Sequence, residues 1–152
     1  MNELEPINQQ RLFGLDSHLF ELIRLYKANI FPNKIMFSGP KGIGKSTLAY
    51  HFINYILSEE EDYKYNIKNL KISSESSTFK TILNKSNTNL SIVDINFNKK
   101  SVDINQIREL ITSLNKSSFN NKPRFVLIDN IELLNNSSVN ALLKIIEEPN
   151  QN

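Results

Sequence analysis

Apolar residues along this chain follow two kinds of pattern, short continuous runs and longer stretches with helical spacing. The runs predict three strands, at residues 34–38, 90–95 and 124–128. The helical spacing predicts helices over residues 16–28, 47–57 and 104–115, and a fourth before Pro149. Strands that alternate with helices are typical of an α/β fold with a mostly parallel sheet. The apolar run at 124–128 predicts a strand that is buried on both faces.

The remaining segments are polar and carry weaker signals. Residues 1–10 are expected to be poorly ordered, and the acidic run 58–62 to be a solvated helix end or loop. Residues 63–89 predict an irregular or partly helical excursion. Asp16 or Ser17 is expected to cap the first helix, and an Asn or Ser near residue 135 the last one.

A glycine-rich loop connects the strand at 34–38 to the helix at 47–57. Its sequence, G-P-K-G-I-G-K-S at 39–46, matches the phosphate-binding pattern G-x-x-x-x-G-K-[ST]. Glycines allow the backbone to approach a ligand closely, and the start of the following helix favours an anion. The pattern predicts that ATP is held by Gly39, Gly42, Ile43, Gly44, Lys45, Ser46 and Thr47. The competing interpretation is a glycine-rich turn in another α/β protein.

A carboxylate follows the predicted strand at 124–128. Asp129 lies where the carboxyl end of a parallel strand faces a ligand crevice, so we expect Ser46 and Asp129 to hold Mg²⁺ together. Many ATP-hydrolysing proteins carry Glu directly after this Asp, whereas this chain has Asn130. An amide cannot take a proton from water at neutral pH, so no catalytic residue is assigned. Asp129 as a simple turn residue is the alternative.

Composition narrows the class of protein. The chain has 152 residues, a formal charge of +2 and no cysteine, which excludes disulfides, thiol catalysis and cysteine zinc sites. With two histidines in the chain, we do not expect a histidine metal site. The sequence carries neither a signal pattern nor an apolar run of membrane-spanning length, so we expect a cytoplasmic protein without a membrane partner.

Three blocks, in order, resemble the clamp-loader subunits of the AAA+ family: F-S-G-P-K-G-I-G-K-S-T-L-A at 37–49, S-V-D-I-N-Q-I-R-E-L at 101–110 and N-A-L-L-K-I-I-E-E-P at 140–149. The resemblance covers about residues 12–149. It implies a P-loop AAA+ three-layer sandwich that binds ATP and Mg²⁺ and helps load a sliding clamp onto primed DNA. The implied partners are other clamp-loader subunits (gamma/tau and delta), the clamp and DNA.

Asn130 and the missing cysteines make the chain more similar to the delta-prime branch of bacterial DNA polymerase III than to gamma/tau, which carries D-E and a cysteine zinc module. In the family a sensor strand, an arginine finger, a lid and a collar domain follow the E-E-P helix. By this resemblance, residues 1–152 are the N-terminal part of the AAA+ domain, incomplete at the C-terminus, and two strands lack their ladder partner.

Two other functions remain open from the residues. Asn130 favours a nucleotide-binding scaffold of the same family without ATPase activity, and the chain length suits a small P-loop kinase. The segment before the P-loop, residues 12–15, either contacts the nucleotide base or only packs. Lys99, Lys100 and Arg108 are candidate DNA contacts, with solvated surface as the alternative.

Overall fold

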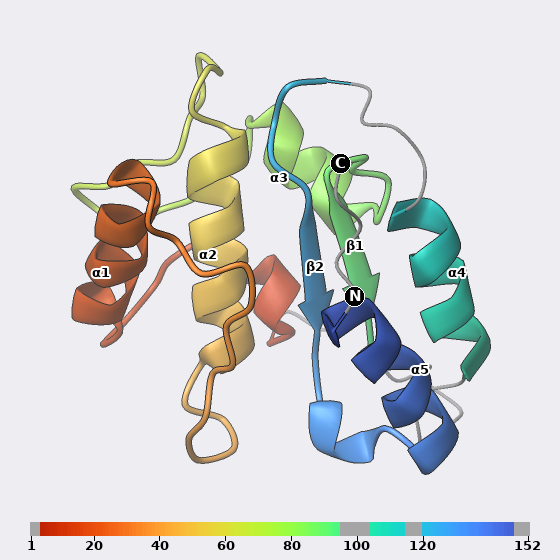
Figure 1. The fold of residues 1–152 in the computed structure, drawn as a ribbon. Helices are drawn as coiled ribbons and strands as arrows, with labels where there is room; N and C mark the ends of the chain where they lie inside the picture. The colour runs from red at the N-terminus through yellow and green to blue at the C-terminus, as the bar shows by residue number, and fades with distance from the viewer. Residues whose placement is uncertain (1–3, 95–103, 115–119, 148–152) are drawn as a thin grey trace. The chain divides into compact units, whose positions relative to one another are not determined.

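The computed structural model of the chain describes residues 4–94, 104–114 and 120–147. It divides the chain into two compact units, Met1–Asn87 and Thr88–Asn152. The first unit contains a 3₁₀ turn η1 (Pro6–Asn8) and helices α1 (Asp16–Lys27), α2 (Lys45–Leu57) and α3 (Ser77–Leu83). The second contains β1 (Leu90–Val93), α4 (Ile104–Leu114), β2 (Phe125–Ile128), η2 (Ile131–Leu133) and α5 (Asn136–Glu147). Figure 1 shows these elements along the chain.

Helix α2 is the core element of the first unit. α1 packs along it (Figure 1), and Leu19, Leu22 and Ile23, apolar residues of α1 at helical spacing, are buried. α2 begins two residues earlier than predicted and is buried on most of its sides, as nine of its residues are buried. Two of the nine are polar, His51 and Asn54. Buried polar groups are generally hydrogen-bonded, so the burial of α2 involves hydrogen bonds as well as apolar packing.

The N-terminal segment is ordered by pairing with residues 70–72, so the expectation of disorder is wrong for residues 6–10. The Leu12 N–H donates to the Leu70 carbonyl at 3.0 Å, and the Ile72 N–H donates to the Gln10 carbonyl at 2.8 Å. Leu12 and Ile72 are both buried. The polar composition of this segment suggested a disordered end, but these long-range backbone hydrogen bonds hold it in place.

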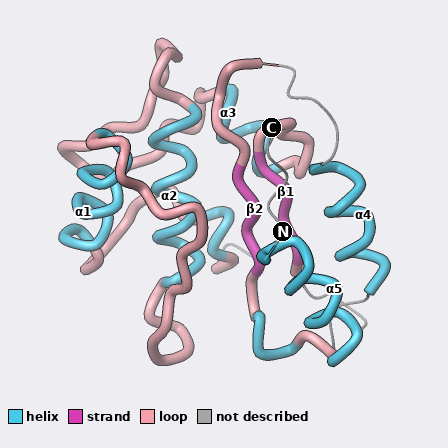
Figure 2. The backbone as a smooth tube through the Cα atoms, viewed as in Figure 1, coloured by secondary structure: helices cyan, strands magenta, loops and turns pink. Residues whose placement is uncertain are grey.

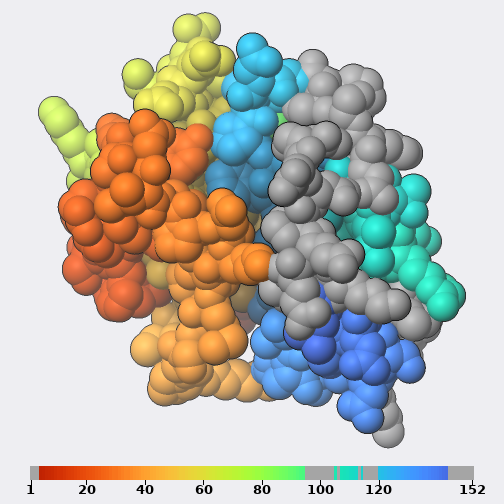
Figure 3. Space-filling model, viewed as in Figure 1, coloured from red at the N-terminus to blue at the C-terminus, as the bar shows by residue number. Residues whose placement is uncertain are grey.

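Two local predictions for the first unit fail. Residues 34–38 form no strand: among the described residues no strand pairs with them, and Met36 is 78 % exposed. An extended segment becomes a strand only through a ladder partner, which the apolar run by itself cannot supply. Figure 3 shows the segment before α2 on the surface of this unit. Helix α1 has Leu15 at its N-cap without a side-chain cap, so neither Asp16 nor Ser17 caps it.

The second unit is a β–α–β arrangement. β1 and β2 pair in parallel with Leu90 opposite Phe125 and Val93 opposite Ile128, and α4 lies between them in the chain. Figure 2 shows that all strand structure of the described residues lies in this pair. The α/β class is therefore confirmed, whereas the complete three-layer sandwich stays a prediction.

The core of this unit matches the predicted helix stripe. Val93 of β1 packs with Ile107 and Leu110 of α4 and Leu142 of α5. The Asn135 carboxamide oxygen accepts the Ser138 N–H at 2.8 Å, so the predicted Asn cap of the last helix is confirmed.

Burial of β2 is weaker than predicted. Val126 is 39 % exposed and the other three residues are partly buried, so the expectation of two buried faces is wrong. In the described residues β2 has one ladder neighbour, β1.

Some predicted features lie outside the described residues, namely the last residue of the predicted strand at 90–95, the candidate DNA contacts Lys99 and Lys100, and the end of the last helix at Pro149. In the part of the chain that is described, no helix combines the length and the apolar character needed to cross a membrane.

Candidate functional site

The loop at 39–46 has the backbone that its glycines predicted. Gly42 and Gly44 have φ values of 83° and 95°, in the left-handed region that side-chain-bearing residues rarely adopt. Gly44 is the N-cap of α2, and the helix begins at Lys45. A Cβ on Gly44 would lie 3.3 Å from Leu15 Cδ1, whereas a Cβ on Gly42 would meet nothing within 4 Å. Glycine is thus required at both positions by conformation, and at Gly44 also by a close neighbour.

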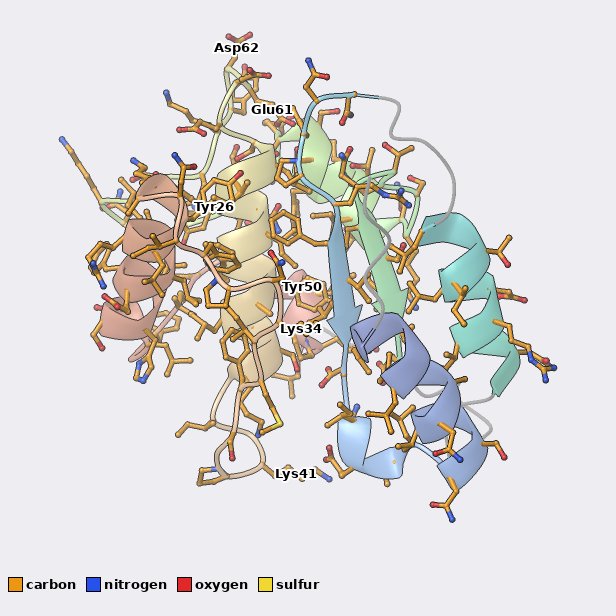
Figure 4. All side chains as sticks on the ribbon, viewed as in Figure 1. Tyr26, Lys34, Lys41, Tyr50, Glu61 and Asp62 are labelled. Atoms are coloured by element: carbon orange, nitrogen blue, oxygen red, sulfur yellow. The ribbon has the colours of Figure 1, made fainter. Side chains whose placement is uncertain are left out.

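The Lys45 ammonium is held against the loop. Its Nζ donates to the carbonyl oxygens of Gly39 at 2.9 Å and Pro40 at 3.0 Å. The Ile43 N–H donates to the Pro40 carbonyl over a long 3.4 Å. Lys41, by contrast, projects from the tip of the loop (Figure 4). The two lysines of the motif therefore differ: Lys45 belongs to the loop, and Lys41 faces solvent.

The start of α2 fits a phosphate group. The N-terminal end of a helix carries a partial positive charge, and the first turn of the 13-residue helix α2 holds no acidic residue. Ser46 and Thr47 lie in this turn and are half-buried. The residues present would hold a nucleotide phosphate through the loop N–H groups and Lys45, and the Ser46 hydroxyl would be the Mg²⁺ ligand from this loop.

The turn at residues 12–15 lies beside the P-loop. Leu12 is buried, and Leu15 is the residue that approaches Gly44. Leu12 and Leu15 thus pack within the first unit, and whether the turn does more than pack stays open. Phe13, between them, is 72 % exposed. Contact of this turn with a nucleotide base stays a prediction.

In the second unit, the two strands end in a pair of carboxylates. Asp94 follows β1 and Asp129 follows β2, one position beyond the pair Val93–Ile128, and the Asp129 N–H donates to the Val93 carbonyl at 3.0 Å. Asn130 connects the two carboxylates. Its N–H donates to Asp129 Oδ1 at 2.9 Å, and its side-chain Nδ2 donates to Asp94 Oδ1 at 3.1 Å.

Asn130 has a left-handed backbone, with φ 52° and ψ 47°. Asn tolerates this conformation better than most residues. The backbone conformation is therefore a structural reason for Asn at position 130. Sequence reasoning missed Asp94 because the predicted strand at 90–95 included it, whereas in the structure β1 ends at Val93 and Asp94 follows it directly. The register of the two strands is what brings Asp94 and Asp129 together.

A shared metal site remains a prediction, because Ser46 belongs to the first unit and Asp129 to the second. Within the described ranges, no group of three or more His, Asp or Glu side chains is arranged to hold a metal ion. Mg²⁺ is usually bound by one or two carboxylates together with phosphate oxygens and water, so a site for it does not require such a group of acidic side chains.

The first unit also contains a buried polar network that sequence reasoning did not find. The His51 ring Nε2 lies 3.1 Å from the Gln9 carbonyl, and Nδ1 lies 2.8 Å from the Tyr65 hydroxyl. Since a carbonyl only accepts, Nε2 carries the proton and Nδ1 accepts from Tyr65. Burial lowers the pKa of His51 to about 4, against a weaker raising effect of the Gln9 hydrogen bond. His51 is therefore neutral and serves as a buried hydrogen-bonding group that connects the N-terminal segment to Tyr65.

Glu61, in the acidic run that was expected to be solvated, caps α3. Its carboxylate accepts the Thr78 N–H at 2.9 Å and the Ser76 hydroxyl at 2.8 Å. Glu61 follows the end of α2 (Figure 4). Burial by itself raises the pKa of Glu61, but the hydrogen bonds from Thr78 and Ser76 outweigh it and lower that pKa. Glu59, Glu60 and Asp62 are exposed, as predicted.

Comparison with known proteins gives two matches. A family model described as DNA polymerase III, delta subunit, matches residues 16–152. DNA polymerase III subunit gamma/tau of Mycoplasma genitalium is 29 % identical over 143 residues. That alignment covers 94 % of this chain and 22 % of the relative, so the chain spans about a fifth of the relative's length.

Proposed function

The chain belongs to the family of the DNA polymerase III delta subunit, and from this premise we propose that it is the ATP-binding AAA+ module of a clamp-loader subunit. In this proposal it binds ATP with Mg²⁺ and works with other clamp-loader subunits, gamma/tau and delta, to place a sliding clamp on primed DNA. The proposal includes the full P-loop sandwich of the AAA+ fold and a cytoplasmic location. The delta-prime role is preferred over gamma/tau because Asn130 follows Asp129.

One observation carries the proposal of nucleotide binding, the backbone of the P-loop. Left-handed glycines at 42 and 44 lead directly into α2, and the Lys45 ammonium lies against the loop carbonyls. An ordinary glycine-rich turn does not need a lysine folded onto its own backbone. A phosphate would offer Lys45 a charged acceptor in place of two neutral carbonyls, and such charge-assisted bonds are the stronger kind.

The experiment is calorimetric titration of the full chain with ATP and Mg²⁺. The Lys45→Ala variant should lose affinity by roughly 1.5–3 kcal/mol, the typical contribution of a hydrogen bond to a charged group. The Lys41→Ala variant removes the same charge from the exposed tip of the same loop, and it should bind as the unmodified chain does. Equal affinities for all three proteins, or equal losses in both variants, would contradict an ATP site at this loop.

A second candidate, the scaffold that binds nucleotide without hydrolysing it, is favoured by Asn130. Its side chain is held by Asp94 at 3.1 Å and has no carboxylate with which to accept a proton. ATP turnover distinguishes the two candidates. Lys45-dependent phosphate release by the unmodified chain, assembled with gamma/tau, delta and clamp, would support the hydrolysing module, and no such release would support the scaffold. Phosphate transfer from ATP to an added small-molecule acceptor would instead support the small P-loop kinase.

A further inference from the structure

Two cations face each other on the surface of the first unit. Arg11 and Lys71 are partners in an isolated antiparallel bridge. The flanking hydrogen bonds run from Leu12 to Leu70 and from Ile72 to Gln10, so Arg11 and Lys71 form the non-hydrogen-bonded kind of pair. In this kind of pair the two side chains lie closer together than in the other. Like charges directly opposite each other are destabilising, so the pairing has a cost within the fold.

Among the residues that the structure describes, no carboxylate pairs with either cation to offset this cost. Both side chains are exposed, and in the part of the chain that the structure describes neither forms an ion pair. Two other surface cations of this unit do form ion pairs: Arg24 contacts Glu21 at 2.7 Å, and Lys80 contacts Glu75 at 3.1 Å. Arg11 and Lys71 are thus available to an anion from outside.

An aromatic ring and an amide extend the pair into a row. The Arg11 guanidinium lies over the Phe13 ring, 5.1 Å from its centre, and Phe13 is 72 % exposed. On the other side, Lys71 pairs with Asn66 through two backbone hydrogen bonds of 2.8 and 3.0 Å. Bridge partners share one face, so Phe13, Arg11, Lys71 and Asn66 form a surface row, named here the 11–71 row.

The backbone beneath the row is held in place. Leu12 and Ile72, which alternate with the row residues, are buried at 3 % and 1 % exposure. Leu70 has a left-handed φ of 48°, an unfavourable conformation for leucine, and its carbonyl accepts the Leu12 N–H. The Asn66 side-chain oxygen accepts the N–H groups of Lys68 and Asn69, both at 3.1 Å, which closes the turn. A strained conformation that its surroundings hold in place is often found at a functional site.

We propose that the 11–71 row binds single-stranded DNA, with Arg11 and Lys71 on phosphates and Phe13 stacked on a base. Proteins that bind single strands combine cations along the backbone with aromatic side chains that stack on bases. A single strand fits better than a duplex because Phe13 can stack only on an unpaired base. An acidic polypeptide would match the charges, but it would leave the exposed ring without a planar partner. The inference adds a contact to the proposed function and does not require ATP binding.

The test is fluorescence anisotropy of labelled oligo(dT) with the full chain, without nucleotide. The Lys71→Gln variant should weaken binding and reduce the slope of log K against log salt by about 0.7, the value for one phosphate contact on a single strand. The Phe13→Ala variant should weaken binding at least about fivefold, the lower limit for loss of one stacked base. The Lys85→Gln variant, an exposed lysine of the same unit outside the row, should bind as the unmodified chain does.

Each arm can overturn the proposal. If duplex DNA of the same length binds as tightly as oligo(dT), the row recognises anions in general and not a single strand. If poly-glutamate binds as tightly, the ligand is an acidic protein. A loss of ATP affinity in the Phe13→Ala variant, with oligo(dT) binding unchanged, would assign the ring to the nucleotide instead. No binding of oligo(dT) by the unmodified chain would end the proposal, and Lys45→Ala should leave oligo(dT) binding intact even if the ATP site is wrong.

A stability measurement supplies an independent readout. If repulsion between Arg11 and Lys71 is real, the Lys71→Gln variant should have a melting temperature equal to or higher than that of the unmodified chain while it loses DNA affinity. A variant that loses affinity only because it unfolds would melt lower, and that result would count against a contact role for Lys71.

Discussion

His51 and Tyr65 share a buried hydrogen bond of 2.8 Å between the ring Nδ1 and the phenol hydroxyl. The bond joins α2 to the loop that follows it, and the Gln9 carbonyl on the other ring nitrogen adds the N-terminal segment. The N-terminal segment, α2 and the loop after α2 thus meet at one neutral imidazole. Stability of the first unit should therefore depend on the protonation of His51.

The first prediction concerns pH. The folded pKa of His51, about 4, lies below the usual value of 6.5. Between these values the unfolded chain binds a proton that the folded chain does not, so stability is full above about pH 6.5 and falls as the pH decreases toward 4. The loss should approach about 3 kcal/mol for a shift of this size. Denaturant unfolding at a series of pH values measures it.

The two histidines of the chain provide a matched control for this prediction. His51→Gln should flatten the dependence of stability on pH between 4 and 6.5, whereas His18→Gln, at an exposed position, should keep it. An unchanged slope in the His51→Gln protein would show that carboxylates, and not this ring, dominate the acid transition.

The second prediction concerns Glu61. Glu61→Gln replaces a carboxylate that accepts from Thr78 and Ser76 by an amide with a single acceptor oxygen, and it should destabilise the chain by about 1–2 kcal/mol, as loss of a helix cap does. The pKa of Glu61 is lowered in the fold, so this contribution is present above the unfolded value and is lost as the pH falls through the folded one. Glu59→Gln, an exposed neighbour, should change little; thermal melting at pH 7 compares the two.

The third prediction separates backbone strain from ligand binding. Gly44 and Gly14 both have positive φ, 95° and 70°. Replacement of either by Ala should cost stability by about 1–2 kcal/mol, because a Cβ is unfavourable in this conformation. Only Gly44→Ala should also lose ATP affinity in calorimetry, since Gly14 lies outside the P-loop. Equal ATP affinities of the two variants would place the nucleotide elsewhere.

The fourth prediction is that the isolated chain hydrolyses ATP slowly or not at all. A missing general base costs ~10²–10⁴-fold in rate, and an arginine finger, which related P-loop enzymes often receive from a partner, is worth ~10³–10⁵-fold. Asn130→Glu should not restore turnover, because it places a second carboxylate beside Asp94 and breaks a 3.1 Å hydrogen bond. Brisk, Lys45-dependent phosphate release by the unmodified chain would refute this prediction.

Asp94 offers a check on that explanation. Asn130→Glu should lower the melting temperature through like-charge repulsion, and the double variant Asp94→Asn, Asn130→Glu should recover it, since the donor and acceptor are exchanged. Failure of the double variant to recover would show that the left-handed backbone of Asn130, and not its side-chain partner, requires the amide.

The sequence by itself determined the elements whose signals are local. Glycine spacing at 42 and 44 predicted the loop that leads into α2, and helical spacing at Ile107 and Leu110 predicted the buried stripe of α4. The run at 124–128 predicted a strand, and Asn135 the cap of α5. These properties depend on the conformation of a few neighbouring residues, which the local chain controls.

Tertiary structure decided the features that need a distant partner. Residues 34–38 have a strand-like sequence but no ladder partner among the described residues, and Asp94 meets Asn130 only because β1 and β2 pair in register. His51 on an apolar helix is buried, and Glu61 in an acidic run is half-buried, because Tyr65 and Thr78 supply their hydrogen bonds. A polar group is buried only where its partner is present, and sequence patterns within one segment cannot report a partner many residues away.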